Sequence, residues 1–201
     1  MFKSVIALFL LIMTSLSAIA GDAHLVQLSH ELLGQQKSIL YMPIGPSGSG
    51  KSTLYQKMKA VAPEIQAFSF DALRCAWYNP NDYDVAYQAS VADPNFYPRA
   101  EGLFCEMLDS SADIYLDGTN LTPTKRCFYV QSAKERGYLI IGLVFSVNLE
   151  TLIARQGTRG DKSIVESEVR RQYSLQVPPQ IGEGFDLVFF LDDNAYLSCR
   201  Q

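Results

Sequence analysis

The sequence contains no run of lysine or arginine residues. Its 201 residues include 17 basic and 21 acidic side chains, which gives a formal net charge of −4 at pH 7. Proteins that bind long nucleic acids usually carry a basic face, so we expect any nucleic-acid substrate to be short or to be bound locally. Hydrophobic residues make up 48% of the chain and charged residues 19%, which is typical of a chain that folds around a core.

Histidine and cysteine are also scarce. The only histidines are His24 and His30, and because both lie near the start of the chain we favour a surface or packing role over catalysis. The four cysteines form no CxxC pair and have no histidine at ligand spacing, so we do not expect a zinc site. They are Cys75, Cys105, Cys127 and Cys199. Disulfides would be possible after export, but the spacing selects no partners.

No apolar run reaches the roughly 20 residues that a membrane span needs. Lys3 precedes an apolar stretch over residues 5–16, and Ala18-Ile19-Ala20 matches a small-residue cleavage site. This pattern predicts a secretory signal peptide over residues 1–20 and one domain over residues 21–201. We therefore expect an exported protein, periplasmic or secreted, with no integral span after processing. An uncleaved anchor, which would leave the protein on the membrane, and a cytoplasmic amphipathic start are the alternatives.

Short apolar runs alternate with helical or loop segments along the rest of the chain. The predicted strands cover residues 38–44, 65–70, 114–116, 138–147 and 185–191. Helices are expected at residues 23–36 and 52–61, after Thr122-Pro123 as N-cap and first-turn proline, and after Ser163, where Ser163 and Glu166 form a capping-box pattern. The alternation predicts an α/β fold with a mostly parallel five-stranded sheet and helices on both faces.

A glycine-rich turn follows the first predicted strand. Residues 45–53 read GPSGSGKST, which satisfies GxxxxGK[ST] before a predicted helix. The glycines let backbone N–H groups surround phosphate oxygens, and the helix N-terminus adds the positive end of its dipole. The expected ATP-binding residues are Gly45, Ser47, Gly48, Ser49, Gly50, Lys51, Ser52 and Thr53. Lys51 is expected to reach the β- and γ-phosphates and Ser52 to ligate Mg²⁺. The flanking strand and helix disfavour a chance match.

A carboxylate and an arginine follow the second predicted strand. Asp71 comes directly after Phe68-Ser69-Phe70, where it could orient or deprotonate an attacking hydroxyl. Arg74 lies one helical turn later on the same face, where it could bind an acidic part of the substrate. The alternative interpretation is that Asp71 only caps a helix and that Arg74 faces solvent.

Asp117 ends the third predicted strand, just before Gly118. We expect this strand to pair with the strand that precedes the phosphate loop, which would place the carboxylate near the metal in a position like that of Walker B. Contact with the metal would then be indirect. An aspartate that only forms a turn before glycine is the alternative.

Arg155 and Arg159 lie four residues apart and are followed by Gly160 and Lys162. This spacing would put both arginines on one helix face, as in a lid that closes over a nucleotide. They could then stabilise charge on the transferred phosphoryl group. Arginines on an exposed helix face are equally common.

Residues 75–99 are rich in aromatic side chains. They include Trp77, Tyr78, Tyr83, Tyr87, Phe96 and Tyr97. Such side chains can stack on a nucleobase, but we favour packing over the core.

Four blocks together resemble the polynucleotide 5′-hydroxyl kinase family, the kinase half of bacteriophage end-healing enzymes and of related RNA-repair proteins. The blocks are residues 45–53, Asp71 to Arg74, DGTNLTPTKR over residues 117–126, and Arg155 to Lys162 continuing to Arg170 and Tyr173. The resemblance implies a P-loop NTPase fold with an AAA-type ATP-binding domain and an arginine-bearing lid. It further implies Asp71 as general base, Arg74 as a contact to the acceptor's phosphate, and Arg155 and Arg159 as lid arginines. Gly118 interrupts the Asp-Thr-Asn of the family, and no phosphatase domain is expected after the fifth strand.

These patterns predict an ATP- and Mg²⁺-dependent kinase whose acceptor is a hydroxyl, and the resemblance implies that this acceptor is a nucleic-acid 5′-OH. The acidic net charge fits equally well with a small acceptor such as a nucleoside, sugar or nucleotide sugar, as in zeta-toxin-like kinases. A nucleotide-binding switch module with little catalysis is the alternative from another class. The sequence does not distinguish these acceptors, and it does not indicate an oligomeric state.

Overall fold

A computed structural model of the chain describes residues 26, 27, 29, 31, 38–180, 182–192, 197 and 198. The predicted signal peptide, His24, His30 and Cys199 lie outside these residues. The first expected helix is covered only in part, and its four described residues are helical. Cys75, Cys105 and Cys127 are free thiols. Within the described residues, no helix is both long and apolar enough to cross a membrane.

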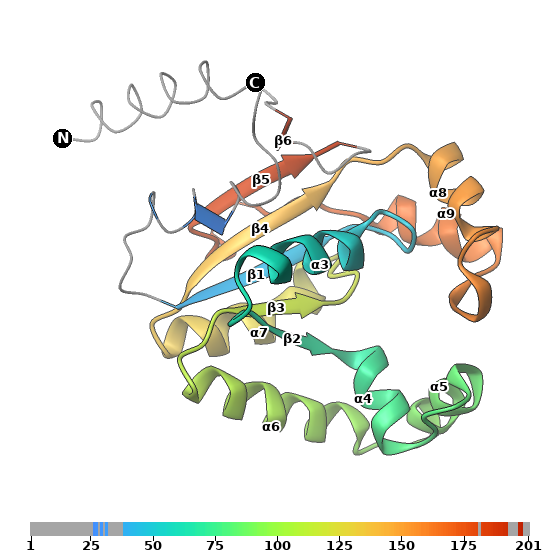
Figure 1. Cartoon of the computed structure of the whole chain (residues 1–201), viewed down its shortest axis with the longest axis horizontal. Coiled ribbons are helices and arrows are strands. Elements are labelled where there is room, and N and C mark those ends of the chain that lie inside the picture. The colour runs from blue at the N-terminus through green and yellow to red at the C-terminus, as the bar shows by residue number, and fades with distance from the viewer. Residues whose placement is uncertain are drawn as a thin grey trace.

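Strands and helices alternate from Ile39 onward (Figure 1). The strands are β1 (Ile39–Ile44), β2 (Gln66–Ser69), β3 (Ile114–Asp117), β4 (Leu139–Phe145), β5 (Leu187–Leu191) and β6 (Leu197–Ser198). The helices are α3 (Lys51–Val61), α4 (Phe70–Trp77), α5 (Tyr83–Ala92), α6 (Phe96–Asp109), α7 (Pro123–Glu135), α8 (Leu149–Gln156), the 3₁₀ turn η1 (Gly160–Lys162) and α9 (Glu166–Leu175).

The strands form one sheet in the order β2-β3-β1-β4-β5-β6. β1 to β5 pair in parallel, as predicted, and β6 adds an antiparallel edge. The expectation of five strands therefore missed β6. Two residues are too few to show the alternation by which a strand is recognised in a sequence.

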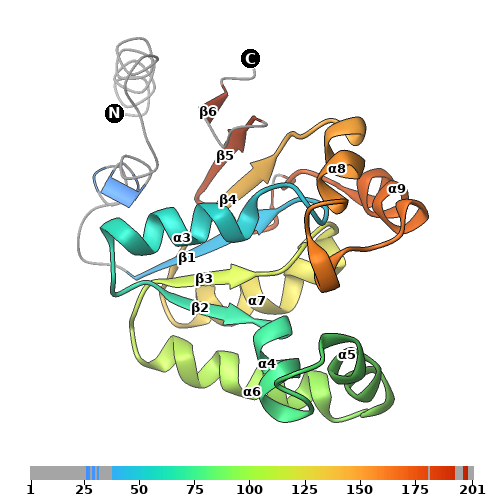
Figure 2. The same cartoon turned by 45° about the vertical axis from the view of Figure 1, so that its right-hand side comes forward.

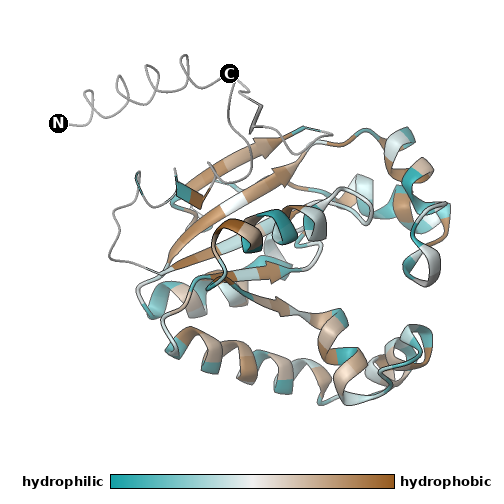
Figure 3. Cartoon of the chain, in the orientation of Figure 1, coloured by the Kyte–Doolittle hydropathy of each residue, from teal (hydrophilic) through white to brown (hydrophobic). Residues whose placement is uncertain are grey.

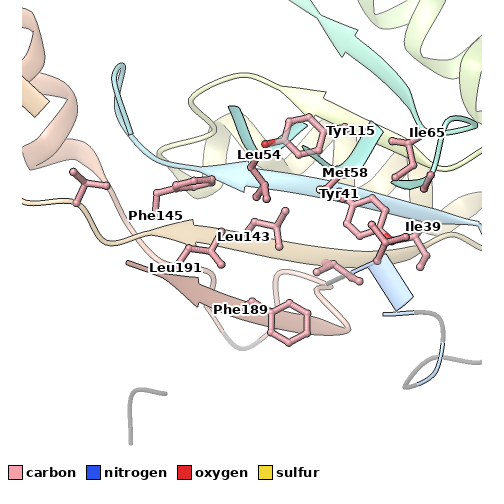
Figure 4. Close-up of a cluster of buried hydrophobic side chains, with 14 of the residues drawn as sticks. Ile39, Tyr41, Leu54, Met58, Ile65, Tyr115, Leu143, Phe145, Phe189 and Leu191 are labelled. Atoms are coloured by element: carbon pink, nitrogen blue, oxygen red, sulfur yellow. The ribbon is translucent and has the colours of Figure 1, made fainter. Parts of the chain in front are cut away.

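Helices cover both faces of the sheet, which gives two apolar layers. Every residue of β1 is buried, as expected for the central strand of a parallel sheet. On one face, Ile39 and Tyr41 pack with Leu54 and Met58 of α3 (Figure 4). On the other face, Leu40 of β1 belongs to the cluster that α6 and α7 cover. Among the described segments, β4 and β5 are mostly hydrophobic, whereas the helices carry mixed surfaces (Figure 3).

The connections after two neighbouring strands leave the sheet in opposite directions. β1 and β3 are adjacent, with Leu40 opposite Ile114. The helix that follows β1, α3, packs on one face, whereas α7, which follows β3, packs on the other. In open α/β sheets, ligands bind at the carboxyl ends of strands where the connections diverge in this way. The phosphate loop, Asp71 and Asp117 all lie at this edge of the sheet.

The helix-start signals had mixed outcomes. Thr122 caps α7 and Pro123 is the first helical residue, as predicted, with the Thr122 side chain accepting a hydrogen bond from the Lys125 N–H. The capping box at Ser163 was wrong, because α9 begins at Glu166 with Val165 as N-cap. The Ser163 N–H instead donates to the carbonyl of Gly160 and closes η1.

Candidate active site

The phosphate loop joins β1 to α3 and depends on two glycines. Gly48 and Gly50 have φ angles of +86° and +102°, a left-handed conformation that other residues adopt at a cost. A Cβ on Gly48 would lie 2.8 Å from Nε2 of Gln156, so the side-chain amide of Gln156 would have to shift. The Gly45 N–H donates to the carbonyl of Thr119, 3.0 Å away, which ties the loop to the connection that follows β3.

Lys51 is the first residue of α3 and is buried. Its Nζ donates to the carbonyls of Gly45 and Pro46, at 2.9 and 2.6 Å, and to the hydroxyl of Ser49 at 3.2 Å. Burial lowers the pKa of Lys51 to about 8, and the nearby carboxylate of Asp117 partly opposes this shift. The lysine therefore lies at the helix N-terminus and inside the loop, where phosphate oxygens would bind.

Asp117 ends β3, which pairs with β1 as predicted. Burial raises its pKa, and Lys51 opposes that shift, so the two groups influence each other across the loop. The hydroxyl of Ser69 is 3.4 Å from Oδ2 of Asp117. Hydroxyl and carboxylate oxygens are the ligands that Mg²⁺ prefers, and Asp117 and the exposed residue Ser52 carry oxygens of these two kinds.

Asp117 is the last residue of β3, and Asn120, which follows Gly118 and Thr119, has a structural position. Asn120 is buried with a φ of +48°. Its side-chain amide donates to the carbonyls of Pro43, at 2.8 Å, and Leu116, at 3.1 Å. Asn120 therefore fastens the ends of β1 and β3 together.

Asp71 lies in the first turn of α4, directly after β2. Ser69 is the N-cap of this helix, and its side chain accepts a hydrogen bond from the Ala72 N–H. The interpretation of Asp71 as a mere cap is therefore wrong. Its Oδ1 accepts hydrogen bonds from Arg74, at 2.9 Å, and from the hydroxyl of Tyr83, at 2.7 Å. The Asp71 side chain is 46% exposed and therefore accessible from solvent.

Arg74 is buried, so the alternative of a solvent-facing arginine is also wrong. Besides Asp71, it donates through Nε to the hydroxyl of Ser90 at 3.0 Å. Its guanidinium lies 5.2 Å from the ring of Tyr87 and 5.0 Å from that of Phe96. Arg74 thus holds α4 against α5 and α6, and its spare hydrogen-bonding capacity toward a substrate is small.

The two predicted lid arginines do not share a helix. α8 ends at Gln156 and Gly157 is its C-cap, so Arg159 follows the helix and precedes η1. Both side chains nevertheless reach the phosphate loop. Arg155 donates to the carbonyl of Gly48 at 3.2 Å, and Arg159 donates to the hydroxyl of Ser47. The turn at Gly157 redirects the chain, so that two residues on different elements converge on one loop.

Several hydrogen bonds to the phosphate loop and to Asp71 could not be predicted from a sequence motif. Nε2 of Gln156 donates to the carbonyl of Ser47 at 3.2 Å, and the Ser47 N–H donates to Oε1 of Gln172 at 2.8 Å. These glutamines lie more than 100 residues from the loop along the chain. Tyr83 is likewise an unpredicted neighbour of Asp71. The sequence predicted that the segment with Arg155 and Arg159 lies near the phosphates, but it did not predict these individual contacts.

The aromatic segment mostly packs, as favoured from the sequence. Phe96 is fully buried, and its ring contacts those of Trp77, Tyr78 and Tyr97. The half-buried Tyr83 differs because its hydroxyl points to Asp71.

Comparison with a family model defines the class of this protein. The model described as "AAA domain" matches residues 40–177, from β1 to just beyond α9. This match covers more than half of the chain, which therefore belongs to this AAA domain family of P-loop proteins. The sequence matches none of the curated proteins with which it was compared.

Three solved structures show how widely this fold is used. The chain is similar to one in the Pnkp1/Rnl/Hen1 RNA repair complex, with 20% identity and a TM-score of 0.57 over 69% of this chain and 44% of that one. It is also similar to a gluconokinase from Sinorhizobium meliloti 1021, with 19% identity and a TM-score of 0.51 over 78% and 82%. A third similarity is to AvrRxo1-ORF1:-ORF2 with ATP, with 14% identity and a TM-score of 0.59 over 81% and 57%. The chain thus spans less than half of the RNA-repair chain and less than two thirds of the third chain, and the likeness is one of fold.

Proposed function

We propose that this protein is an ATP- and Mg²⁺-dependent kinase that transfers the γ-phosphate to a hydroxyl acceptor. The observation that carries the proposal is the position of Asp71. It stands at the end of β2, on the same sheet edge as Lys51 and Asp117, with one carboxylate oxygen held by Arg74 and Tyr83. A phosphate-binding loop alone would serve a switch equally well, whereas an oriented carboxylate beside it suits transfer to an alcohol.

The nucleotide side would bind ATP through the loop. The backbone N–H groups of Gly48 and Gly50 and the N-terminus of α3 suit the phosphates, and Lys51 adds the matching charge. Ser52 would hold Mg²⁺ directly, and Asp117 would hold it indirectly. The metal would neutralise charge on the phosphates. Arg155 and Arg159, already at the loop, would stabilise the charge on the transferred group.

The acceptor side would supply the proton transfer. The acceptor oxygen attacks the γ-phosphorus, the bond from that phosphorus to the β–γ bridging oxygen breaks, and ADP leaves. The acceptor's proton passes to the carboxylate of Asp71. The side chain is exposed enough to meet an acceptor and is fixed enough to orient one.

A nucleic-acid 5′-hydroxyl is our first candidate acceptor. The order of the four sequence blocks supports it, and the likeness to a chain of an RNA repair complex is consistent with it. A small alcohol is the second candidate. Arg74 is buried and already bound to Asp71 and Ser90, which leaves it little capacity to grip an acceptor phosphate.

The deciding experiment is transfer of labelled γ-phosphate from ATP with Mg²⁺, using the full chain. The acceptors are a 5′-hydroxyl oligonucleotide, adenosine, gluconate and uridine diphosphate glucose, with ATP hydrolysis measured when no acceptor is present. We expect Lys51→Ala to abolish transfer by weakening nucleotide binding. Asp71→Ala should retain ATP binding, and its rate of transfer should fall about 10²- to 10⁴-fold, which is the usual contribution of a general base.

Each outcome distinguishes the candidates. Transfer to the oligonucleotide alone supports the first acceptor, and transfer only to small alcohols replaces it with the second. ATP binding with neither transfer nor hydrolysis would refute the kinase proposal in favour of a nucleotide-dependent switch.

A further inference from the structure

Tyr83 occupies a defined place at the start of α5. The connection from α4 is shaped by side-chain hydrogen bonds, with Oδ1 of Asn79 accepting from the N–H groups of Asn81 and Asp82. Asp82 then caps α5, because its Oδ1 accepts a hydrogen bond from the Val85 N–H at 3.0 Å. Tyr83 follows as the first helical residue and lies against the first turn of α4.

The Tyr83 hydroxyl and Arg74 bind the same oxygen of Asp71. The two distances to Oδ1 are 2.7 Å and 2.9 Å. Among the residues that the structure describes, no hydrogen bond reaches Oδ2 of Asp71. Two donors on one oxygen fix the plane of the carboxylate and leave its second oxygen available.

The phenol is suited to remain a donor. Burial raises the pKa of Tyr83 well above its ordinary value, and the hydrogen bond to Asp71 raises it further. The hydroxyl is therefore protonated at any pH at which the protein would work, and it cannot itself serve as the base.

We propose that Tyr83 is a positioning residue of the transfer step, which together with Arg74 holds the Asp71 carboxylate so that Oδ2 accepts the proton of the acceptor hydroxyl. This inference rests on the proposed kinase function. It assigns a role to a tyrosine that the sequence motifs did not include. Tyr83 would raise the rate of transfer by orienting the base, because a carboxylate already held in the geometry of attack loses less entropy in the reaction.

The ring of Tyr83 also faces the lid segment. Nζ of Lys162, in η1, lies 5.9 Å from its centroid, and α5 and η1 approach each other on the side of the strand ends (Figure 2). Substitution by phenylalanine keeps this ring contact and removes only the hydroxyl. The variant therefore isolates the bond to Asp71.

The test compares Tyr83→Phe with Tyr78→Phe in the full chain. Tyr78 makes the same kind of bond, from its hydroxyl to Oδ2 of Asp93 at 2.7 Å, but does not contact Asp71. Kinetics are measured with whichever of the four acceptors the wild type phosphorylates, or as ATP hydrolysis if water is the only acceptor. Thermal unfolding of both variants checks that they are folded.

We expect Tyr83→Phe to lower kcat about ten-fold, a fraction of the general-base contribution, with KM for ATP unchanged. Tyr78→Phe should leave both constants near the wild-type values. In the Asp71→Ala background, Tyr83→Phe should cause no further loss, because its effect acts through that carboxylate.

Equal losses in the two tyrosine variants, or a loss confined to KM for ATP, would overturn the inference. A full further loss in the Asp71→Ala background would do the same. If the wild type shows neither transfer nor hydrolysis, the kinase proposal fails and this role fails with it. Normal kcat in Tyr83→Phe beside an active wild type refutes the positioning role alone.

Discussion

The proposed nucleotide side and the proposed acceptor side of the site are each held in place by a different kind of contact. Around the phosphate loop, Lys51 and Arg155 donate mainly to backbone carbonyls, and the glycines set the path of the chain. Around Asp71, the bonds run between side chains, from Arg74 of the same helix and from Tyr83 of α5. Contacts to backbone persist when neighbouring residues change, whereas contacts between side chains depend on both partners. The acceptor side is therefore where a change of sequence would most readily change specificity.

The connection that follows β3 is held in place by a buried ion pair. The side chain of Arg126 is fully buried and binds both carboxylate oxygens of Glu183 at 2.8 Å. It also donates to the carbonyls of Asn120 and Val177, at 3.0 and 2.9 Å. It thereby links the connection after β3 to the segment that follows α9.

The largest effect on stability is expected from Arg126→Ala. It would leave the partly buried carboxylate of Glu183 and two carbonyls without their donor, which costs about 3–5 kcal/mol in the free energy of unfolding. Urea unfolding measures the change. Arg136→Ala is the control, because its pair with Asp109 is largely exposed and should matter little. Similar midpoints for the two variants would contradict a special role for the buried pair.

Removal of a lid arginine comes next and addresses the nucleotide side alone. Arg159→Ala should lower the rate of transfer about 10²-fold, as expected when a donor to the developing charge is lost. ATP affinity should change much less, because the loop and Lys51 remain. Single-turnover transfer and a fluorescent ATP analogue measure the two quantities. Arg171→Ala is a control on α9, since its exposed side chain pairs with Glu168. A fall in ATP affinity as large as the fall in rate would show a binding role instead.

The smallest effect concerns pH and again separates the two sides. Lys51 has a pKa of about 8 in the folded chain, and bound phosphate would favour its charged form. Nucleotide binding should therefore take up a proton near and above pH 8. ATP affinity should fall by up to about ten-fold per pH unit above pH 8.5.

Isothermal titration calorimetry in two buffers of different ionisation enthalpy would report this proton uptake. Asp71→Ala should retain it, because Asp71 influences the pKa of Lys51 less than burial and Asp117 do. Lys51→Ala should lose it. An ATP affinity that is independent of pH between 7.5 and 9.5 would rule out Lys51 as the titrating group.

Local patterns predicted those parts of the site that are contiguous in the chain. GxxxxGK[ST] needs only a strand, a turn and a helix in sequence, and β1 and α3 appear where that pattern put them. The pairing of β3 with β1 was predicted as well. Parallel strands have their carboxyl ends at one edge of the sheet, so this pairing places Asp117 beside the phosphate loop. The roles of Asp71, Arg155 and Arg159 in transfer remain predictions, although the structure brings all three to this edge.

Two predictions were wrong where the local sequence pattern did not show whether the chain continues as a helix or turns. Arg155 and Arg159 have helical spacing, but Gly157 ends the helix between them. Ser163 resembles an N-cap, yet it closes a 3₁₀ turn. In both cases a short turn satisfied the backbone hydrogen bonds as well as a helix would, and propensity alone cannot choose between them.

Local sequence patterns were enough to predict the phosphate loop, the order of the five parallel strands along the chain and the carboxylates that follow β2 and end β3. These features follow from hydrophobic periodicity and from the backbone requirements of glycine, which act over a few residues. The packing of the elements, in contrast, buries Arg74, brings Tyr83 to the same oxygen of Asp71, and lets Gln156 and Gln172 hold the loop. Such contacts join side chains on separate elements, and their geometry is set by how the helices pack on the sheet.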